Sequence, residues 1–113
     1  MNILILEDNS QRVETFIELL NPHNLVITEN ANVAIEHLTN SIFDIIFLDH
    51  DLGEGNGTGS LVSSFLSRCT ENRNNESFIV IHSWNIAAVE DMKKDLPQAH
   101  AIPFASNAFY EMF

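Results

Sequence analysis

Cysteine is nearly absent from this sequence, since Cys69 is the only one. A single thiol cannot form a disulfide within the chain, so no disulfide framework supports the fold, and a reducing compartment is expected. A long apolar run is missing as well. The N-terminal run of residues 2–6 is short, has no basic flank and leads directly into Glu7 and Asp8. It is therefore neither a signal peptide nor a membrane span, and we predict a soluble cytoplasmic protein.

Positive charge is also scarce. Five lysines and arginines face 16 aspartates and glutamates, which gives a formal net charge of −11. The resulting field repels a polyanion such as duplex DNA, so we expect no nucleic-acid polymer as a partner. A small anionic ligand is compatible with this charge if a cation or helix N-termini receive it.

The sequence contains no repeats, linkers or low-complexity segments. Its length of 113 residues suits one domain, which we expect to span residues 1–113. A chain of this length buries roughly two thirds of its unfolded surface, which is enough for one core without covalent cross-links. The sequence does not indicate an oligomeric state.

Apolar runs alternate with helical patterns along the chain. The runs predict strands over residues 2–6, 24–28, 43–49 and 78–82, and a short fifth strand over 101–104. The patterns predict helices over residues 10–20, 30–39, 60–69 and 86–96, with a shortened last helix over 106–113. On the first and third helices, Ile17 and Leu61 belong to the apolar faces that we expect to point inward.

Nearly continuous apolar strands are typical of a parallel sheet that helices cover on both faces. The alternation with short connections therefore predicts a doubly wound α/β fold of the flavodoxin-like kind, with strand order 2-1-3-4-5. In such folds ligands bind beyond the carboxyl ends of the strands, at the point where the strand order reverses.

Polar side chains gather where three of the predicted strands end. These stretches are Glu7-Asp8, Asp49-His50-Asp51 and His82-Ser83-Trp84-Asn85. If the three strands are neighbours, four carboxylates meet at one rim and repel each other unless a cation lies among them. Such oxygen-rich sites suit Mg²⁺, Mn²⁺ or Ca²⁺, and added histidines suit a transition metal. The alternative is that Glu7, Asp8 and Asp51 cap helices or remain solvated.

Other residues near this rim each permit two interpretations. His82 is either a structural histidine or a metal ligand or general acid. Asn85 either donates to a phosphoryl oxygen or caps the fourth helix. Arg12 either touches a ligand phosphate or pairs with a carboxylate, and Trp84 either stacks on a base or packs at the mouth of the sheet.

A glycine occupies every second position from Gly53 to Gly59. Such a loop lets the backbone approach a ligand phosphate, for which Gly53 is the candidate, and it leads into a helix N-terminus. No GK[ST] follows, so it is not a P-loop. The alternative is a mobile turn that Thr58 or Ser60 caps.

The stretches "NILILEDN", "FDIIFLDHDL" and "FIVIHS" resemble the first, third and fourth strands of response-regulator receiver domains. The resemblance covers nearly the whole chain and implies a receiver-like fold. It implies that Glu7, Asp8 and Asp49 bind Mg²⁺, and that Asp49 accepts a phosphoryl group with help from Ser83. Receivers also carry a lysine after the fifth strand, whereas "AIPFASN" has Pro103 but no lysine. Its absence argues against phosphorylation as a switch.

The additional residues resemble a divergent branch, the cyclic-phosphate-processing receiver-like domains. That branch shows the acidic pair with a nearby arginine, here Arg12, a DHDL-type third motif and an HSxN-type fourth motif. All three are present in order. The resemblance implies processing of cyclic phosphates, and it links the family to nucleotide signalling in phage–bacterium conflict.

Three functions follow from these residues. The first is a metal-dependent phosphodiesterase that cleaves a cyclic nucleotide or cyclic phosphate, and so counteracts cyclic-nucleotide immune signalling. The second is a non-catalytic sponge for a cyclic nucleotide, and the third is a phospho-acceptor receiver that uses Asp49. For the first, the metal ligands for Mg²⁺ or Mn²⁺ would be Glu7, Asp8, Asp49 and Asp51; the catalytic residues His82, His50, Ser83 and Asn85; and the phosphate-binding residues Arg12, Asn85 and Gly53.

Overall fold

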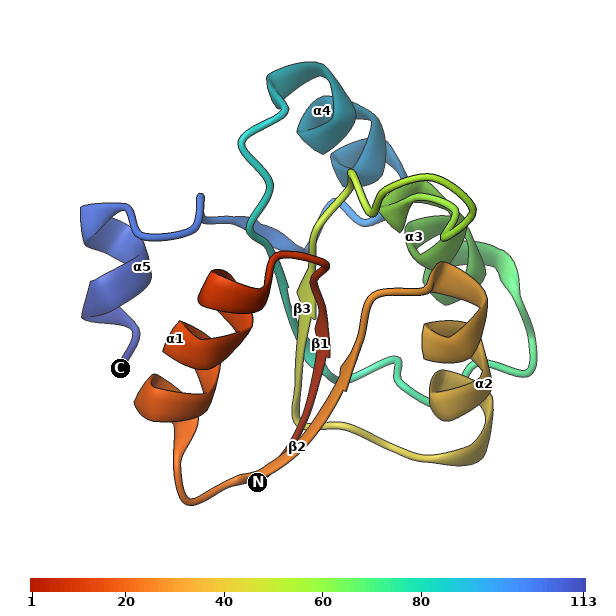
Figure 1. Cartoon of the computed structure of the whole chain (residues 1–113). Helices are drawn as coiled ribbons and strands as arrows, with labels where there is room; N and C mark the ends of the chain where they lie inside the picture. Colours follow the sequence, from red (N-terminus) through yellow and green to blue (C-terminus); the bar gives the residue numbers. More distant parts are fainter.

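The computed structural model describes all 113 residues, and helices and strands alternate along the chain (Figure 1). The strands are β1 (Asn2–Leu6), β2 (Asn24–Thr28), β3 (Ile45–Leu48), β4 (Phe78–Ile81) and β5 (His100–Ala101). The helices are α1 (Ser10–Leu20), α2 (Ala31–Asn40), α3 (Gly59–Arg68), α4 (Ile86–Asp95) and α5 (Asn107–Glu111). None of these helices combines the length and the apolar character that crossing a bilayer requires.

The five strands form one parallel sheet of order β2-β1-β3-β4-β5. This confirms the predicted doubly wound fold, including its strand order and its short last helix. The central register pairs Leu6 with Leu48 and Leu48 with Ile81, so the carboxyl ends of β1, β3 and β4 are level. The residues that follow these three strands therefore lie side by side at the same edge of the sheet.

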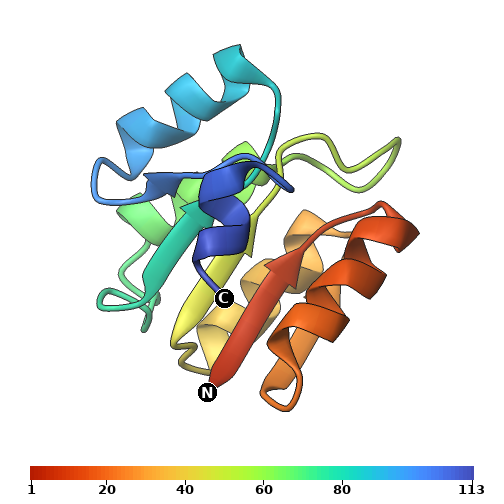
Figure 2. The ribbon, with the colours of Figure 1, turned by 90° about the vertical axis from the view of Figure 1, so that its left-hand side faces the viewer.

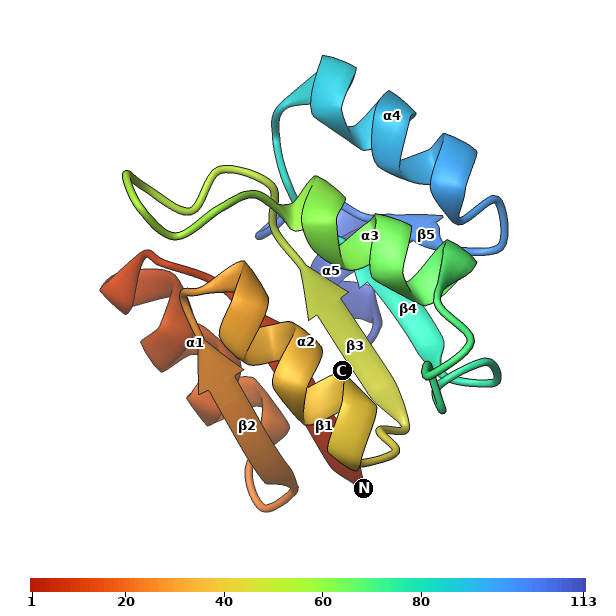
Figure 3. The ribbon, with the colours of Figure 1, turned by 90° about the vertical axis from the view of Figure 1, so that its right-hand side faces the viewer.

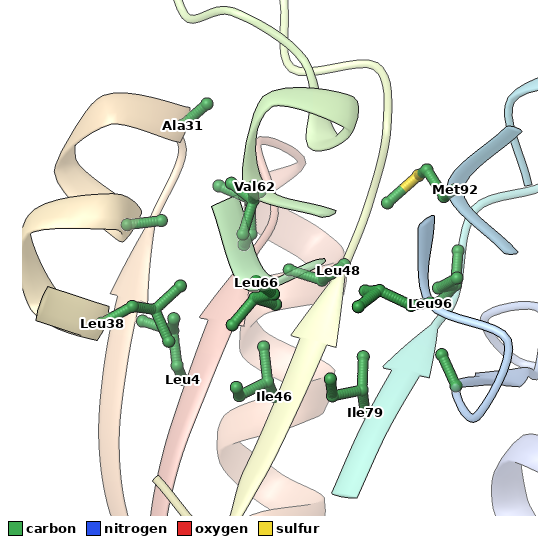
Figure 4. Close-up of a cluster of buried hydrophobic side chains, with 14 of the residues drawn as sticks. Leu4, Ala31, Leu38, Ile46, Leu48, Val62, Leu66, Ile79, Met92 and Leu96 are labelled. Carbon is green, nitrogen blue, oxygen red and sulfur yellow. The ribbon is translucent and has the colours of Figure 1, made fainter. Parts of the chain in front are cut away.

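Helices cover both faces of the sheet and divide the core into two clusters. α1 and α5 lie over one face (Figure 2), and α2, α3 and α4 lie over the other (Figure 3). Side chains alternate across each strand, so successive residues enter opposite clusters. The larger cluster contains Leu4, Ile46, Leu48 and Ile79 from the sheet and Leu38, Val62, Leu66, Met92 and Leu96 from the helices and their ends (Figure 4).

The prediction that two helix side chains point inward is wrong. Ile17 on α1 is 45% exposed and Leu61 on α3 is 47% exposed. In each helix a narrower stripe meets the sheet: Phe16 and Leu20 on α1, and Val62 and Leu66 on α3. An α-helix turns by about 100° per residue, so the neighbouring position already faces the solvent.

The fifth strand was predicted over residues 101–104, but it begins one residue earlier and ends at Ala101. Backbone pairing continues beyond it, since the N–H groups of Ile102 and Phe104 donate to the carbonyls of Ile81 and His82. Pro103 lies between them and has no N–H to donate. The structure thus keeps Phe104 beside the end of β4 although the regular strand has ended.

Side-chain caps fix where the helices begin. Asn9 Oδ1 accepts from the backbone N–H groups of Gln11 and Arg12, and Asn30 and Ser106 cap α2 and α5 in the same way. Capping by Asn9 places α1 immediately after the acidic pair that follows β1. Cys69 is the half-buried C-cap residue of α3.

Candidate functional site

Glu7, Asp49 and His82 lie side by side beyond the ends of β1, β3 and β4. The register continues past the strands, because the N–H of Asp49 donates to the Leu6 carbonyl and that of His82 to the Leu48 carbonyl. Alternation then turns all three side chains toward the face that α1 and α5 cover. Their candidate ligand atoms lie within 4.8 Å of one another, and all three residues are buried.

Glu7 is held by four polar groups. Its Oε1 accepts from His82 Nε2 at 2.9 Å and lies 3.7 Å from Arg12 Nη1, while its Oε2 accepts from the backbone N–H groups of Asp8 and Asn9. Burial opposes ionisation, but these contacts, led by the one from His82, outweigh it and lower the pKa of Glu7 to about 2. Glu7 is therefore a carboxylate, and the proton on His82 Nε2 is the one it accepts.

His82 lies beneath Glu7 and has no exposed surface. Its ring is surrounded by phenylalanines, with centroid distances of 5.2 Å to Phe16 and 6.4 Å to Phe47 and Phe104. Its Nδ1 is buried and has no hydrogen-bond partner. The imidazole thus reaches the site through Glu7 and not by contact with the solvent side of the rim.

The surroundings of Asp49 and Asp8 disfavour the ionised form of both carboxyl groups. Asp49 is 6% exposed, and burial together with the nearby Glu7 raises its pKa to about 6, although His82 opposes this rise. Its Oδ1 accepts from the N–H of His50 at 2.9 Å. Burial and the Glu7 carboxylate also raise the pKa of the more exposed Asp8. A cation beside these two acids would relieve both effects.

Asp51 lies in a better-solvated position. Its Oδ1 accepts from His50 Nδ1 at 3.0 Å and its Oδ2 accepts from Asn85 Nδ2 at 3.3 Å, and these bonds lower the pKa of Asp51. Asn85 Oδ1 accepts from the Ala88 N–H at the start of α4, so the capping interpretation of Asn85 is confirmed. Ser83 Oγ accepts from the Asn85 N–H, which leaves the hydroxyl proton available.

A pocket of about 260 Å³ opens above these groups. Its walls are Glu7, Asp8, Asn9, Arg12, Asp49, Asp51, Ser83, Trp84 and Asn85. Arg12 is the only basic residue among them, and its guanidinium lies 5.0 Å from the centre of the Phe104 ring. The structure thus brings together every predicted metal and phosphate residue except Gly53, and neither His50 nor His82 is part of the lining.

The glycine loop is folded back onto the strand end. Asp51 and Thr58 form an antiparallel bridge, and Thr58, at the N-cap position of α3, makes no side-chain capping bond. Gly53 has φ +84°, and a Cβ there would lie 3.7 Å from Asp8 Oδ2. A Cβ on Gly59 would overlap the carbonyl oxygen of Asp49, so only glycine lets α3 start this close to β3.

Three contributors had not been predicted. Phe16 and Phe104 enclose His82, Phe104 also underlies Arg12, and Gly59 lets α3 approach Asp49. A glycine immediately before a predicted helix could have indicated a close approach. Nothing in the sequence pattern distinguishes Phe16 and Phe104 from other core aromatics.

Comparison with known proteins gives a family and a fold. The model of the family described as "Cyclic-phosphate processing Receiver domain" matches residues 2–98. No curated protein is similar in sequence. Among solved structures, the phosphorylated cyanobacterial phytochrome response regulator RcpA is 20% identical, with a TM-score of 0.76 over 98% of this chain and 86% of that one.

Two further structures agree. The Mn(2+)-bound response regulator Rcp1 is 17% identical, with a TM-score of 0.76 over 98% of this chain and 87% of that one. A Burkholderia pseudomallei response regulator with a phosphorylated aspartic acid, a calcium ion and citrate is 21% identical, with a TM-score of 0.76 over 98% of this chain and 63% of that one. At such identities the likeness establishes the receiver fold.

Proposed function

From the fact that this chain belongs to the cyclic-phosphate processing receiver domains, we propose that it is a divalent-metal-dependent phosphodiesterase that opens a cyclic nucleotide or cyclic phosphate. The observation that carries the proposal is the small acidic pocket, to which the ends of β1 and β3 supply carboxylates and the end of β4 supplies Ser83 and Asn85. Removal of a cyclic-nucleotide signal would counteract immune signalling of the kind found in phage–bacterium conflict.

The donor set fits a hard divalent cation, Mg²⁺ or Mn²⁺. Asp8, Asp49 and Asp51 all line the pocket, and the pKa values of Asp8 and Asp49 are raised, as expected for acids that lack a counter-charge. Glu7 was predicted as a ligand too: its Oε2 accepts two N–H groups and positions the turn at Asp8, whereas its Oε1 accepts only from His82 and keeps a lone pair for the cation. A divalent cation at this position supplies positive charge to the phosphate oxygens and makes water more acidic.

The residues of the chain would bind the phosphate and move the proton. Arg12, at the edge of the pocket, would hold a phosphate oxygen, and the free hydroxyl proton of Ser83 would donate to another. His50 Nδ1 lies 3.0 Å from Asp51 Oδ1, which faces the pocket, so this pair would supply the proton to the leaving oxygen. His82 would keep Glu7 in its ionised form.

The test is cleavage of a panel of cyclic mono-, di- and trinucleotides with Mg²⁺ or Mn²⁺, read by mass spectrometry, with EDTA in a parallel series. We expect a linear product that EDTA abolishes. The control is Asp49→Asn, which keeps the shape of the site and removes a ligand charge. Measured metal binding without any product would contradict the proposal, and recovery of the intact nucleotide after heating would indicate a sponge.

A phospho-acceptor role remains a second candidate because Asp49 is buried at the end of β3 beside Asp8 and Ser83. Two of the similar structures are phosphorylated response regulators. Incubation with acetyl phosphate and Mg²⁺ would then add the mass of one phosphoryl group, which Asp49→Asn would lose. No lysine lines the pocket to stabilise such a phosphate, which favours the phosphodiesterase.

A further inference from the structure

Trp84 is an exposed aromatic residue at the edge of the acidic pocket. It is 58% exposed, although the end of β4 and the two residues between β4 and Trp84 are buried. Its Nε1 donates to the Phe104 carbonyl at 2.9 Å, which fixes the indole by its polar edge. An immobilised indole with free apolar surface loses little conformational entropy when a flat ligand lies on it.

A second hollow, of about 490 Å³, adjoins the acidic pocket across Asn9, Arg12 and Trp84, which line both. Gln11 and Thr15 of α1 and the Phe104 ring complete most of its wall. The hollow thus offers an aromatic surface, one cation and uncharged polar side chains. Ligand sites commonly have this volume and this mixture of apolar walls with a few polar groups.

The position of Arg12 joins the two spaces. Its guanidinium lies 5.0 Å from the centre of the Phe104 ring and 3.7 Å from Glu7 Oε1, so its charge stands on the boundary. A ligand whose anionic group lies in the acidic pocket would therefore have its uncharged part beside Trp84. A ligand with a phosphate at one end and a flat aromatic ring at the other matches both spaces.

We propose that the hollow between α1 and Trp84 binds the base of a nucleoside cyclic phosphate, stacked on the indole, while the phosphate lies in the acidic pocket. The inference rests on the proposed function and names its substrate class: nucleotides rather than base-free cyclic phosphates. Stacking on a protein aromatic ring strengthens the binding of each base about 5-fold to 150-fold.

The neighbouring hollow on the other side of Trp84 is a less suitable place for the base. It measures about 270 Å³, lies between α4 and β5, and is lined by Ile86, Val89 and Pro103 among others. It meets the acidic pocket only at Ser83 and Trp84 and contains no basic residue. Ile86, which is 77% exposed, therefore provides a matched control for Trp84.

Trp84 is the only tryptophan, so intrinsic fluorescence reports directly on this position. The probes are adenosine 2′,3′-cyclic phosphate and, without a base, glycerol cyclic phosphate, added by rapid mixing with Mg²⁺ and again with EDTA. We expect the nucleotide to quench the emission and the base-free probe to leave it unchanged. Calorimetric titration should show that Trp84→Ala weakens nucleotide binding about 5-fold to 150-fold, that Trp84→Phe recovers part of it, and that Ile86→Ala binds as the unaltered protein does.

Absence of quenching, equal affinity of Trp84→Ala and the unaltered protein for the nucleotide, or an equal loss in Ile86→Ala would each overturn the inference. Its failure is distinguishable from failure of the proposed function. Cleavage of the nucleotide without quenching would leave the phosphodiesterase intact and remove the base site. Quenching without cleavage would keep the base site and remove the phosphodiesterase.

Discussion

The two ends of the sheet both bury polar side chains, but the groups differ in charge and in how well they are hydrogen-bonded. Beyond the carboxyl ends of the strands lie Glu7, Asp49 and His82. At the other end, in the connection between α3 and β4, lie Asn72 and Asn74, which are 7% and 2% exposed. Comparison of the two clusters separates a polar group that supports the fold from one suited to bind a ligand.

Asn74 is neutral and fully hydrogen-bonded. Its Oδ1 accepts from the Phe43 N–H at 2.7 Å, and its Nδ2 donates to the Leu38 and Ser41 carbonyls, both at 3.0 Å. Its own N–H donates to Asn72 Oδ1. Every donor and acceptor of the amide is used, so the residue ties the loop to the end of α2 and the start of β3 and leaves nothing for a ligand.

The carboxyl end has the opposite properties. Asp49 is buried with a pKa raised to about 6, and His82 Nδ1 has no partner. Perturbed titrations and unsatisfied buried atoms concentrate at functional sites, because the energy they cost is recovered only when a ligand arrives. The difference shows that burial of polar groups alone does not indicate a ligand-binding site. Buried acids with raised pKa values and buried polar atoms without partners do indicate one.

The largest effect is expected from His82→Phe. It removes the hydrogen bond from His82 Nε2 to the buried Glu7 carboxylate and leaves Arg12, 3.7 Å away, as its one side-chain partner, which costs about 3–5 kcal/mol of unfolding free energy. Urea unfolding near pH 7 measures this loss. Glu7→Gln in the same chain should restore most of it because the buried carboxylate that has lost its hydrogen bond is removed. A His82→Phe protein as stable as the unaltered one would show that Glu7 does not depend on the imidazole.

At the other end, Asn74→Ala should destabilise the protein by about 3 kcal/mol. It leaves the Phe43 N–H and the Leu38 and Ser41 carbonyls without partners, and each such buried group costs about 1–3 kcal/mol. The folded variant should bind Mn²⁺ as before, because the site lies at the opposite end of the sheet. Weakened metal binding would show that the two ends are coupled.

Asp49→Asn should have the opposite sign and stabilise the metal-free protein by up to about 3 kcal/mol at about pH 8. The folded pKa of about 6 is above the ordinary aspartate value of 3.8, so the folded state holds the proton more tightly than the unfolded chain. Stability is thus lost as pH rises from about 4 to about 6, and asparagine imitates the protonated form. The gain should vanish near pH 4, and a loss at pH 8 would contradict this account.

Much of the fold was predictable because its signals are local. Near-continuous apolar strands and short connections indicated a parallel sheet, and α1 and β2 have the predicted bounds. The strand ends bearing Glu7, Asp49 and His82 followed from the same reasoning. The predictions for Ile17 and Leu61 were wrong because the width of a buried helix face depends on the surface against which the helix packs. The apolar pattern of the helix itself does not contain that information.

The roles within the site were less predictable because they depend on contacts between distant segments. Asn85 had two open interpretations, and the structure shows it capping α4 while it also donates to Asp51. Arg12 likewise pairs with Glu7 yet lines the pocket. That His82 lies among phenylalanines and behind Glu7 is set by α1 and the residues after β5, which are far from it in sequence.

The smallest expected effect is the dependence of metal affinity on pH. A cation must displace the proton from Asp49, so below the pKa of about 6 the Kd for Mn²⁺ should rise about tenfold per pH unit, whereas above about pH 7 it should be constant. Glu7, with a pKa of about 2, stays ionised throughout and contributes no slope. Calorimetric titration between about pH 5 and pH 8 measures the curve, and Asp49→Asn should bind more weakly with a flatter profile. A constant Kd across this range would mean that Asp49 is not a ligand, and the contrast between the two ends of the sheet would then rest on His82 alone.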